Sequence, residues 1–335
     1  VVSPAYFTNQ EAETANRYGF GGSQASFTIQ QIHDDLAGMV RKITAMSFRK
    51  DCNGKYAGQR YPVHLAYQQN MTIKLSTAVN PAAKISTTFA ANHGKDLVVV
   101  LNSTTVKFPQ ISLPATWPAP WKYVVTFSKP FLHTGQGGLC WEMLTHSHTA
   151  KEGKYLDCAN IKIPGSAFGK GCAPKGSTAP ADDHYVFIGS SGGNWILYSR
   201  ANVVPSQNVV TLIGVNTSMW GSLTLPFDLT PLGAAGCSIS LAPVITAAGT
   251  AASSGFANHT IATVPINTAL SGTAFYTQMI CLDPGRGPMP VITTNGWKQP
   301  FPFTAVPVAR AYALDDTSTT GKVTTNYGYV TRFSY

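Results

Sequence analysis

The clearest sign of the fold is the stretch Ile43-Thr44-Ala45-Met46-Ser47-Phe48-Arg49, in which apolar and polar side chains alternate. A period of two indicates a β-strand with one buried face. The stretch Met71-Thr72-Ile73-Lys74-Leu75-Ser76 repeats the pattern, and residues 97–101 form an apolar run of strand length. Clusters of Gly, Pro, Asn and Ser separate such runs about every 8–15 residues, a spacing typical of sandwiches. The sequence therefore predicts an all-β protein built from antiparallel β-sandwiches of the jelly-roll or immunoglobulin-like type.

The composition agrees with this class. Only 12% of the 335 residues are charged, against about 25% in a typical globular domain. Glutamate is limited to Glu11, Glu13, Glu142 and Glu152. A chain so poor in charge cannot supply the polar faces of many solvent-exposed helices. The hydrophobic share of 44% is enough to bury a core, which excludes wholesale disorder.

The net charge of +9 arises because acidic residues are scarce. The basic residues are scattered, and their only loose cluster comprises Arg41, Lys42, Arg49, Lys50 and Lys55. This pattern predicts no nucleic-acid site, and weak adhesion to anionic surfaces fits it better. No apolar run reaches the roughly 18 residues of a membrane helix, so no membrane span is predicted.

Histidines and acidic pairs raise the question of a metal site. His133, His146 and His148 lie near Glu142, and His146 and His148 would share one face of a strand. Such a group could hold copper or zinc, but an ordinary polar strand face is the favoured explanation. The Asp pairs are Asp34-Asp35, Asp182-Asp183 and Asp315-Asp316. None belongs to a calcium-loop motif, so the metal is left unknown, no cofactor is predicted, and a structural calcium ion built from separate loops stays open.

The sequence holds no complete motif of nucleophilic or phosphate-binding chemistry. Gly189-Ser190-Ser191-Gly192-Gly193 has the spacing Gly-x-Ser-x-Gly, but the strand-like Asn194-Trp195-Ile196 follows it where a nucleophile elbow needs a helix. The segment Gly189-Ser190-Ser191-Gly192-Gly193 lacks the lysine and helix of a phosphate loop, so we predict a hairpin turn there. The sequence predicts no catalytic residues and a protein that is not an enzyme.

Tryptophan offers a different kind of site. In Trp117-Pro118-Ala119-Pro120-Trp121 two tryptophans flank prolines outside the apolar strands. Exposed aromatic rings can stack on sugar rings, so Trp117 and Trp121 are candidate ligand-stacking residues.

Six widely spaced cysteines without a Cys-x-x-Cys pair favour disulfides and an oxidising compartment, with six buried thiols as the alternative. Cys140 and Cys158 flank a short segment that two neighbouring strands could form, so we expect them to pair. The chain begins at Val1 without Met, as expected of an exported protein whose signal peptide has been cleaved.

Two sets of motifs carry a resemblance. The first set is Gln30-Gln31-Ile32-His33, Ile43-Thr44-Ala45-Met46-Ser47-Phe48-Arg49, Ile73-Lys74-Leu75-Ser76-Thr77, Ile85-Ser86-Thr87-Thr88-Phe89-Ala90-Ala91-Asn92-His93-Gly94 and Lys129-Pro130-Phe131. The second set is Gly169-Lys170-Gly171-Cys172, Trp220-Gly221-Ser222-Leu223-Thr224-Leu225-Pro226-Phe227-Asp228-Leu229, Leu232-Gly233-Ala234-Ala235-Gly236-Cys237, Val264-Pro265-Ile266 and Phe275-Tyr276-Thr277-Gln278. Together they resemble the uncharacterised secreted β-sandwich proteins of Planctomycetes and related bacteria. The resemblance implies an exported β protein and supplies no catalytic residues.

The resemblance also implies a domain arrangement. Residues 304–335 look like the closing strands of the first module although they follow the second. We therefore expect a discontinuous first domain, 1–164 plus 304–335, with a second domain, 165–303, inserted in it. Cys172 and Cys237 are the two Gly-Cys positions of the second module and are expected to pair. Cys52 and Cys281 are left as a third pair that would tie the two domains.

These features predict a non-catalytic structural or cell-surface protein, extracellular, that assembles with itself into an oligomer or filament. Residues 1–26 could add a strand to a neighbouring subunit, with Tyr6, Phe7, Tyr18 and Phe20 in its pockets; the alternative is that they pack on their own domain. The alternative function is a carbohydrate-binding module for extracellular polysaccharide.

Overall fold

The protein is all-β, as predicted. A computed structural model describes residues 1–12, 14–22, 24–52 and 62–335. The helices in these ranges are short 3₁₀ turns: η1 (Ala5–Thr8), η2 (Asp34–Leu36), η4 (Ala82–Lys84), η5 (Phe89–Asn92), η6 (Thr230–Leu232) and η7 (Thr268–Leu270). None of the helices in the described part of the chain is long and apolar enough to cross a membrane.

The chain divides into two compact units. One comprises Val1–Lys162 and Ala305–Tyr335, and the other comprises Ile163–Thr304. The predicted boundaries, 1–164 with 304–335 and 165–303, lie one or two residues away. Whether each unit folds by itself as a domain stays a prediction.

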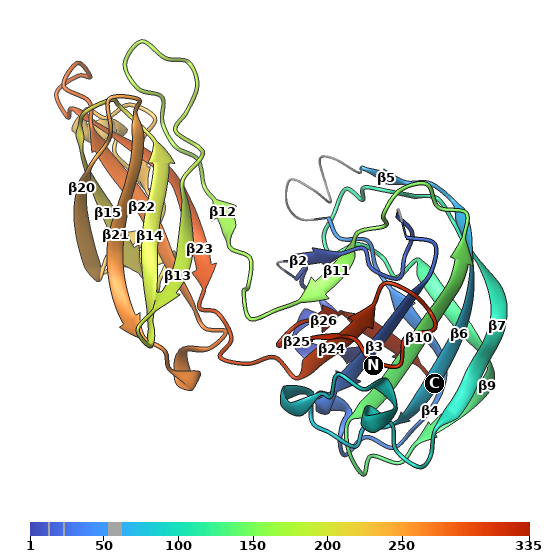
Figure 1. The fold of residues 1–335 in the computed structure, drawn as a ribbon. Helices are drawn as coiled ribbons and strands as arrows, with labels where there is room; N and C mark the ends of the chain where they lie inside the picture. The colour runs from blue at the N-terminus through green and yellow to red at the C-terminus, as the bar shows by residue number, and fades with distance from the viewer. Residues whose placement is uncertain (13, 23, 53–61) are drawn as a thin grey trace. The chain divides into compact units, whose positions relative to one another are not determined.

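Two antiparallel sheets build the first unit (Figure 1). The four-stranded sheet has the order β1 (Val2–Ser3), β27 (Thr331–Ser334), β4 (Arg41–Phe48) and β9 (Tyr123–His133). The six-stranded sheet has the order β25 (Lys322–Thr325), β24 (Val308–Ala313), β3 (Phe27–His33), β10 (Leu139–His148), β6 (Tyr67–Thr77) and β7 (Val98–Phe108). Smaller pairings join β2 (Thr14–Asn16), β11 (Leu156–Ala159) and β26 (Gly328–Tyr329), and β5 (Val63–His64) with β8 (Ile111–Ser112).

The core of this unit lies between its two main sheets. Met46 and Phe48 of β4 pack in the same cluster as Ile73 of β6 and Trp141 of β10. Neighbouring residues along a strand point to opposite faces. On β10, Trp141 therefore faces this core, whereas Cys140 belongs to a separate cluster on the other face of the six-stranded sheet. That second face carries the candidate site.

The N-terminal segment packs on its own unit. Strand β1 pairs with β27, and the side chains of Phe7 and Phe20 are fully buried. The ring of Tyr18 stacks on Tyr312, with centroids 4.9 Å apart and an interplanar angle of 14°. The hypothesis that residues 1–26 reach a neighbouring subunit is therefore wrong, because their aromatic anchors are already used inside the unit.

The second unit is also a sandwich (Figure 1). Its five-stranded sheet has the order β12 (Ser166–Phe168), β23 (Val291–Pro300), β22 (Ala274–Leu282), β15 (Asn208–Gly214) and β20 (Ile245–Thr250). Its three-stranded sheet has the order β13 (Tyr185–Ser191), β14 (Asn194–Asn202) and β21 (Phe256–Pro265). Two small hairpins pair β16 (Met219–Trp220) with β17 (Leu223–Thr224), and β18 (Phe227–Asp228) with β19 (Ser238–Ile239).

Side chains from both sheets of the second unit meet in its interior. Trp195 of β14 packs in one cluster with Ile213 of β15 and Phe275 of β22. The predicted hairpin turn is confirmed between β13 and β14, where Gly192 and Gly193 have φ angles of 56° and 75°. Positive φ at both central residues is what a tight hairpin turn requires, and glycine adopts it without strain.

Disulfide pairing is correct for one predicted pair and wrong for two. Cys172 and Cys237 are bonded, whereas the other four cysteines are free and buried. Cys140 cannot meet Cys158, because Cys158 lies in the core between the sheets and Cys140 faces the opposite side of β10.

The predicted link between the two domains is wrong as well. Cys281 is buried in the core of the second unit. Cys52 is buried within the first unit, with its Sγ 3.7 Å from the carbonyl oxygen of Lys50. Both thiols lie inside their own units, and burial raises the pKa of each, to about 12 for Cys52 and about 11 for Cys281. They are inert structural thiols.

Acid is expected to destabilise the second unit through His184. Burial lowers the pKa of this histidine to about 4, against the effect of its bond to the carbonyl of Arg200. The unfolded chain takes up the proton near pH 6.5, so the full stability is present above that pH. The free energy of unfolding should then fall by about 1.4 kcal/mol per pH unit between 6.5 and 4.

Chemical denaturation of the protein and of a His184→Gln variant at several pH values measures this slope. The variant should lose the part of the slope that belongs to His184. Parallel stability curves for the two proteins would contradict the assignment.

Candidate ligand-binding site

A pocket of about 400 Å³ lies in the first unit, on the face of the six-stranded sheet that points away from the core. Its floor comes from β3, β6 and β10, and its walls from η5 and the loop between β24 and β25. The residues that line it are Thr28, Lys74, Phe89, Ala90, His93, Gly94, Leu97, Glu142, Leu144, Asp316, Thr317, Ser318 and Thr319.

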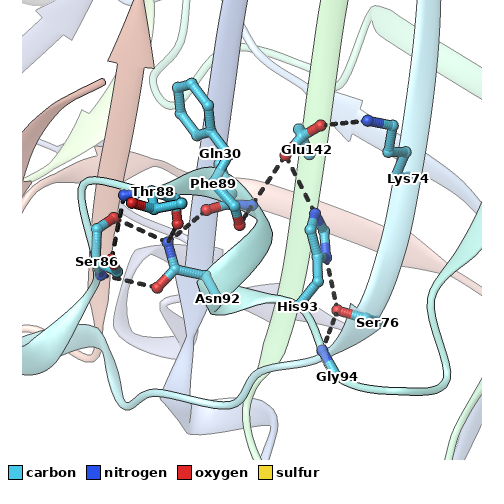
Figure 2. Close-up of polar contacts among 10 residues, drawn as sticks. All are labelled: Gln30, Lys74, Ser76, Ser86, Thr88, Phe89, Asn92, His93, Gly94 and Glu142. Atoms are coloured by element: carbon cyan, nitrogen blue, oxygen red, sulfur yellow. Dashed lines mark hydrogen bonds and ion pairs between the residues drawn. The ribbon is translucent and has the colours of Figure 1, made fainter. Parts of the chain in front are cut away.

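The carboxylate of Glu142 is the centre of the site (Figure 2). Its Oε1 accepts a hydrogen bond from Nζ of Lys74 at 2.7 Å. Its Oε2 accepts from Nε2 of Gln30 at 3.0 Å and lies 3.2 Å from Nε2 of His93. The residue is only 4% exposed, yet it lines the pocket. Three donors from β3, β6 and the segment after η5 therefore fix one buried anion.

His93 connects this carboxylate to the backbone. The Nδ1 atom of His93 lies 2.7 Å from Oγ of Ser76, and this Oγ accepts the N–H of Gly94 at 3.2 Å. One arrangement satisfies every group: Gly94 N–H donates to Ser76, Ser76 O–H to Nδ1, and Nε2–H to Glu142 (Figure 2). Serine, histidine and glutamate are the residue types of a hydrolytic triad. Ser76, however, is fully buried and does not line the pocket, so its role here is positioning.

The protonation state of Glu142 follows from these contacts. Burial by itself raises the pKa of the carboxyl, but the hydrogen bonds from His93 and Lys74 and the charge of Lys74 outweigh it and hold the pKa below its ordinary value. The group is therefore ionised at neutral pH and acts only as an acceptor. Two carboxylate oxygens offer about four acceptor positions, of which three are used, so Oε1 keeps one for a ligand.

Asn92 holds the wall of the pocket in place. Its Nδ2 donates to Oε1 of Gln30 at 2.7 Å and to the carbonyl of Ser86 at 2.9 Å, and its Oδ1 accepts the N–H of Ser86 at 2.8 Å (Figure 2). Gln30 in turn donates to the carbonyl of Phe89 at 2.9 Å. The η5 turn is thus tied to the same glutamine that contacts Glu142, which makes the pocket rigid on this side.

The opposite wall is rich in hydroxyl groups. Oδ2 of Asp316, in the loop after β24, lies 2.6 Å from Nδ1 of His146 on β10. Asp315 accepts from the backbone and the hydroxyl group of Ser318, and likewise of Thr317. The loop between β24 and β25 is therefore ordered by its own aspartates, with threonine and serine side chains facing the pocket.

The histidines considered as candidate metal ligands do not come together. His133 is on β9 of the other sheet, where its Nε2 lies 3.1 Å from the carbonyl of Leu36. His146 contacts Thr72 and Asp316, and His148 contacts the carbonyl of Gln24. Each ring has its own partner, so these three histidines do not converge on a metal site. Of the group, Glu142 lines the pocket, and His146 contacts Asp316, which lines it too.

Asp34, Asp35 and Asp183 bind backbone groups of segments distant in sequence, and in the described part of the chain the aspartate pairs form no shared group of metal ligands. Asp34 accepts the N–H of Ala82, Asp35 accepts the N–H of Ala5, and Asp183 accepts the N–H of Asn202. An acidic group that the sequence did not reveal lies elsewhere in the first unit. Its members are Glu11, Asp51 and Asp157, whose oxygens lie within 4.8 Å of one another. Arg49 balances part of its charge, and the question of a structural calcium ion built from separate loops stays open.

The two candidate stacking residues, Trp117 and Trp121, lie in different environments. Trp117 is 56% exposed, in agreement with a ligand-stacking role, which stays a prediction. The ring of Trp121 is flanked by Arg49 and Arg332, whose guanidinium carbons lie 4.9 and 5.5 Å from its centroid. Those contacts leave Trp121 a poorer platform for a sugar ring than its partner.

Sequence reasoning missed most of the site. Gln30, Lys74, Ser76, Asn92 and His93 were not candidates, although each lies in one of the motifs that carry the family resemblance. The sequence feature that could have indicated the site is the recurrence of polar residues inside these motifs, at positions where neither strand nor turn formation requires a polar side chain.

No family model and no curated protein matches this chain. Among solved structures, two β-glucuronidases from Ruminococcus gnavus align over 84% of the chain, one in complex with D-glucaro 1,5-lactone and one with uronic isofagomine. Both are 7% identical with a TM-score of 0.16, and the chain spans 38% and 45% of their lengths. A likeness at this level carries no argument, so the fold and the pocket define only an all-β protein with a polar site on one sheet face.

Proposed function

We propose that the first unit binds a saccharide in the pocket of Glu142. The observation that carries this proposal is a buried, ionised carboxylate with one free acceptor position at the floor of the pocket. The lining combines apolar Leu97 and Leu144 with the hydroxyl-bearing loop at residues 317–319. A sugar presents hydroxyl groups along its edge and C–H groups on its faces, and both kinds of surface meet a matching partner here.

Binding without catalysis fits the protonation of the site. Glycoside hydrolysis needs one carboxyl group with a raised pKa, so that it can donate a proton. The pKa of Glu142 lies below its ordinary value, and the hydrogen bond from His146 lowers the pKa of Asp316 as well. Both acids are acceptors at neutral pH, which supports a protein that is not an enzyme.

A Glu142→Gln variant should lose saccharide binding. The amide would place an NH₂ group or a single acceptor where Lys74, Gln30 and His93 all donate, and the ligand hydroxyl would lose its charged acceptor. A hydrogen bond to a charged group contributes about 1.5–3 kcal/mol, so affinity should fall about tenfold or more. A glycan array with the labelled protein finds the ligand, and calorimetry then compares the variants.

Glu152→Gln is the matched control, because Glu152 pairs with Lys154 and does not line the pocket. It should bind as the unchanged protein does. If Glu142→Gln keeps full affinity while both variants stay folded, the pocket is not the binding site.

We also propose that the protein is exported and works outside the cell or at its surface, after cleavage of a signal peptide. The Cys172–Cys237 disulfide supports this, because such bonds persist in oxidising compartments.

Self-association, as an oligomer or filament subunit, is the second candidate function, and the second unit favours it. Strand β20 is at the edge of its sheet, and apolar side chains near it are exposed. Val244 is 71% exposed and Ile245 is 56% exposed. An edge strand with apolar neighbours is a common site of pairing between copies. Sedimentation and negative-stain microscopy test this proposal, and a monomer at high concentration would contradict it.

A further inference from the structure

Two smaller hollows adjoin the pocket of Glu142 in the first unit. The second hollow, of about 310 Å³, shares Ser318 with the pocket. The third, of about 110 Å³, shares Tyr18 and Leu314 with the second. All three follow the loop between β24 and β25. A ligand longer than one sugar ring, with one end bound in the pocket of Glu142, would therefore extend into the second and third hollows.

Positive charge dominates these two hollows. Lys322 lines the second, and Arg17 lines the third. Within the described ranges, neither forms an ion pair with a carboxylate. Asp315 is the one acidic residue among the residues that line them, and its oxygens already accept hydrogen bonds from Ser318 and Thr317. The two cations are thus available to an incoming anion.

A third cation lies behind the wall of the second hollow. The guanidinium of Arg310 is 4.9 Å from the ring centroid of Tyr312 and 5.7 Å from that of Tyr18, and these two stacked rings line the hollow. Arg310 is 6% exposed, and its Nε and Nη1 have no hydrogen-bond partner in the described structure. A buried charge is screened less than an exposed one, so its field favours an anion in front of the tyrosines.

We propose that the ligand is an acidic oligosaccharide, whose carboxylate or sulfate groups face Lys322 and Arg17 while its hydroxyl groups reach Glu142. This inference rests on the proposed saccharide binding and adds the chemical class of the ligand. The stacked tyrosines Tyr18 and Tyr312 provide a flat apolar wall for a sugar ring between the two charged ends.

The test compares three sets of oligosaccharides of equal length on the full chain. Fragments of polygalacturonate carry carboxylates, fragments of dextran sulfate carry sulfates, and fragments of dextran are neutral. We expect one of the acidic sets to bind about tenfold more tightly than the neutral set at low salt, with the difference shrinking as salt is added. The two acidic sets distinguish a carboxylate from a sulfate site.

Variants separate local recognition from general attraction. Lys322→Gln and Arg17→Gln should each weaken the binding of the acidic ligand about two- to fivefold, the range of an exposed ion pair. Lys107→Gln, an exposed residue of β7 outside the three hollows, should leave it unchanged.

Equal affinity for neutral and acidic sets would overturn this inference and leave saccharide binding standing. The inference would also be overturned if Lys107→Gln weakened binding as much as Lys322→Gln and Arg17→Gln do. Binding of no set, acidic or neutral, would overturn both proposals.

Discussion

Replacing Arg49 with Met is expected to destabilise the first unit by about 3–5 kcal/mol, the cost of leaving a buried charge without its partner. Arg49 and Asp157 are both fully buried, with Nε of Arg49 2.6 Å from Oδ2 of Asp157. The second oxygen of Asp157 accepts only the N–H of Ala12, at 3.0 Å, among the contacts the structure gives it. The orphaned carboxylate could escape the penalty only by taking up a proton.

The penalty should therefore be smaller at pH 5 than at pH 8. Burial raises the pKa of Asp157 against the attraction of Arg49. In the unfolded chain the same carboxyl has an ordinary low pKa, so the cost of keeping it charged in the folded state grows as the pH rises. Hydrogen exchange in peptides from β4 and β10 measures the loss in the first unit without interference from the second.

Two further variants complete this test. Arg49→Met combined with Asp157→Asn removes both charges and should recover most of the lost stability. Lys42→Met, at an exposed position of β4, the strand that ends just before Arg49, should change the stability by no more than about 0.5 kcal/mol. If Arg49→Met alone stays within 1 kcal/mol of the unchanged protein on the same scale, the pair does not hold the unit together.

Replacing both Cys172 and Cys237 with Ser should cost the second unit about 4 kcal/mol, because their bond closes a loop with a sequence separation of 65 residues. In the chain-entropy model that bond restricts the unfolded chain, and its removal lets the unfolded state gain freedom. Hydrogen exchange in peptides from β22 and β23 should become faster, while peptides from β10 keep their rates.

Cys281→Ala is the matched control for this pair, since Cys281 is a free thiol buried in the same core. Its loss should be smaller, about 1 kcal/mol. A reducing agent should act on the unchanged protein as the double substitution does. A double variant as stable as the parent would contradict a stabilising role for the bond.

The sequence was informative about strands because a strand's pattern is local. The alternation in residues 43–49 predicted β4, and the alternation in residues 71–76 predicted part of β6. Glycines at 192 and 193 predicted the turn between β13 and β14 for the same reason. The orientation of cysteine side chains is not local in this sense. Cys140 and Cys158 are near in sequence, but they lie on different sides of a sheet.

The candidate site shows the same difference between what local sequence patterns reveal and what contacts between distant segments decide. Glu142 drew attention because histidines lie near it in sequence, yet its partners are Gln30, Lys74 and His93, from three other segments. His93 is 49 positions away along the chain, and Gln30 is 112. Neither separation has a signature in spacing. The register of β10 with β3 and β6 places Gln30 and Lys74 opposite Glu142, and His93 reaches it from the segment after η5.

The sequence by itself determined the all-β class and the hairpin at residues 189–193, and the expectation drawn from its motifs included the bond between Cys172 and Cys237 that the structure shows. These follow from patterns within a few residues or from motifs that travel together. Only the tertiary structure decided the partners of Glu142, the ion pair of Arg49 with Asp157, and the burial of Phe7 and Phe20. Such contacts join segments distant in sequence, and they depend on which face of a sheet each side chain occupies.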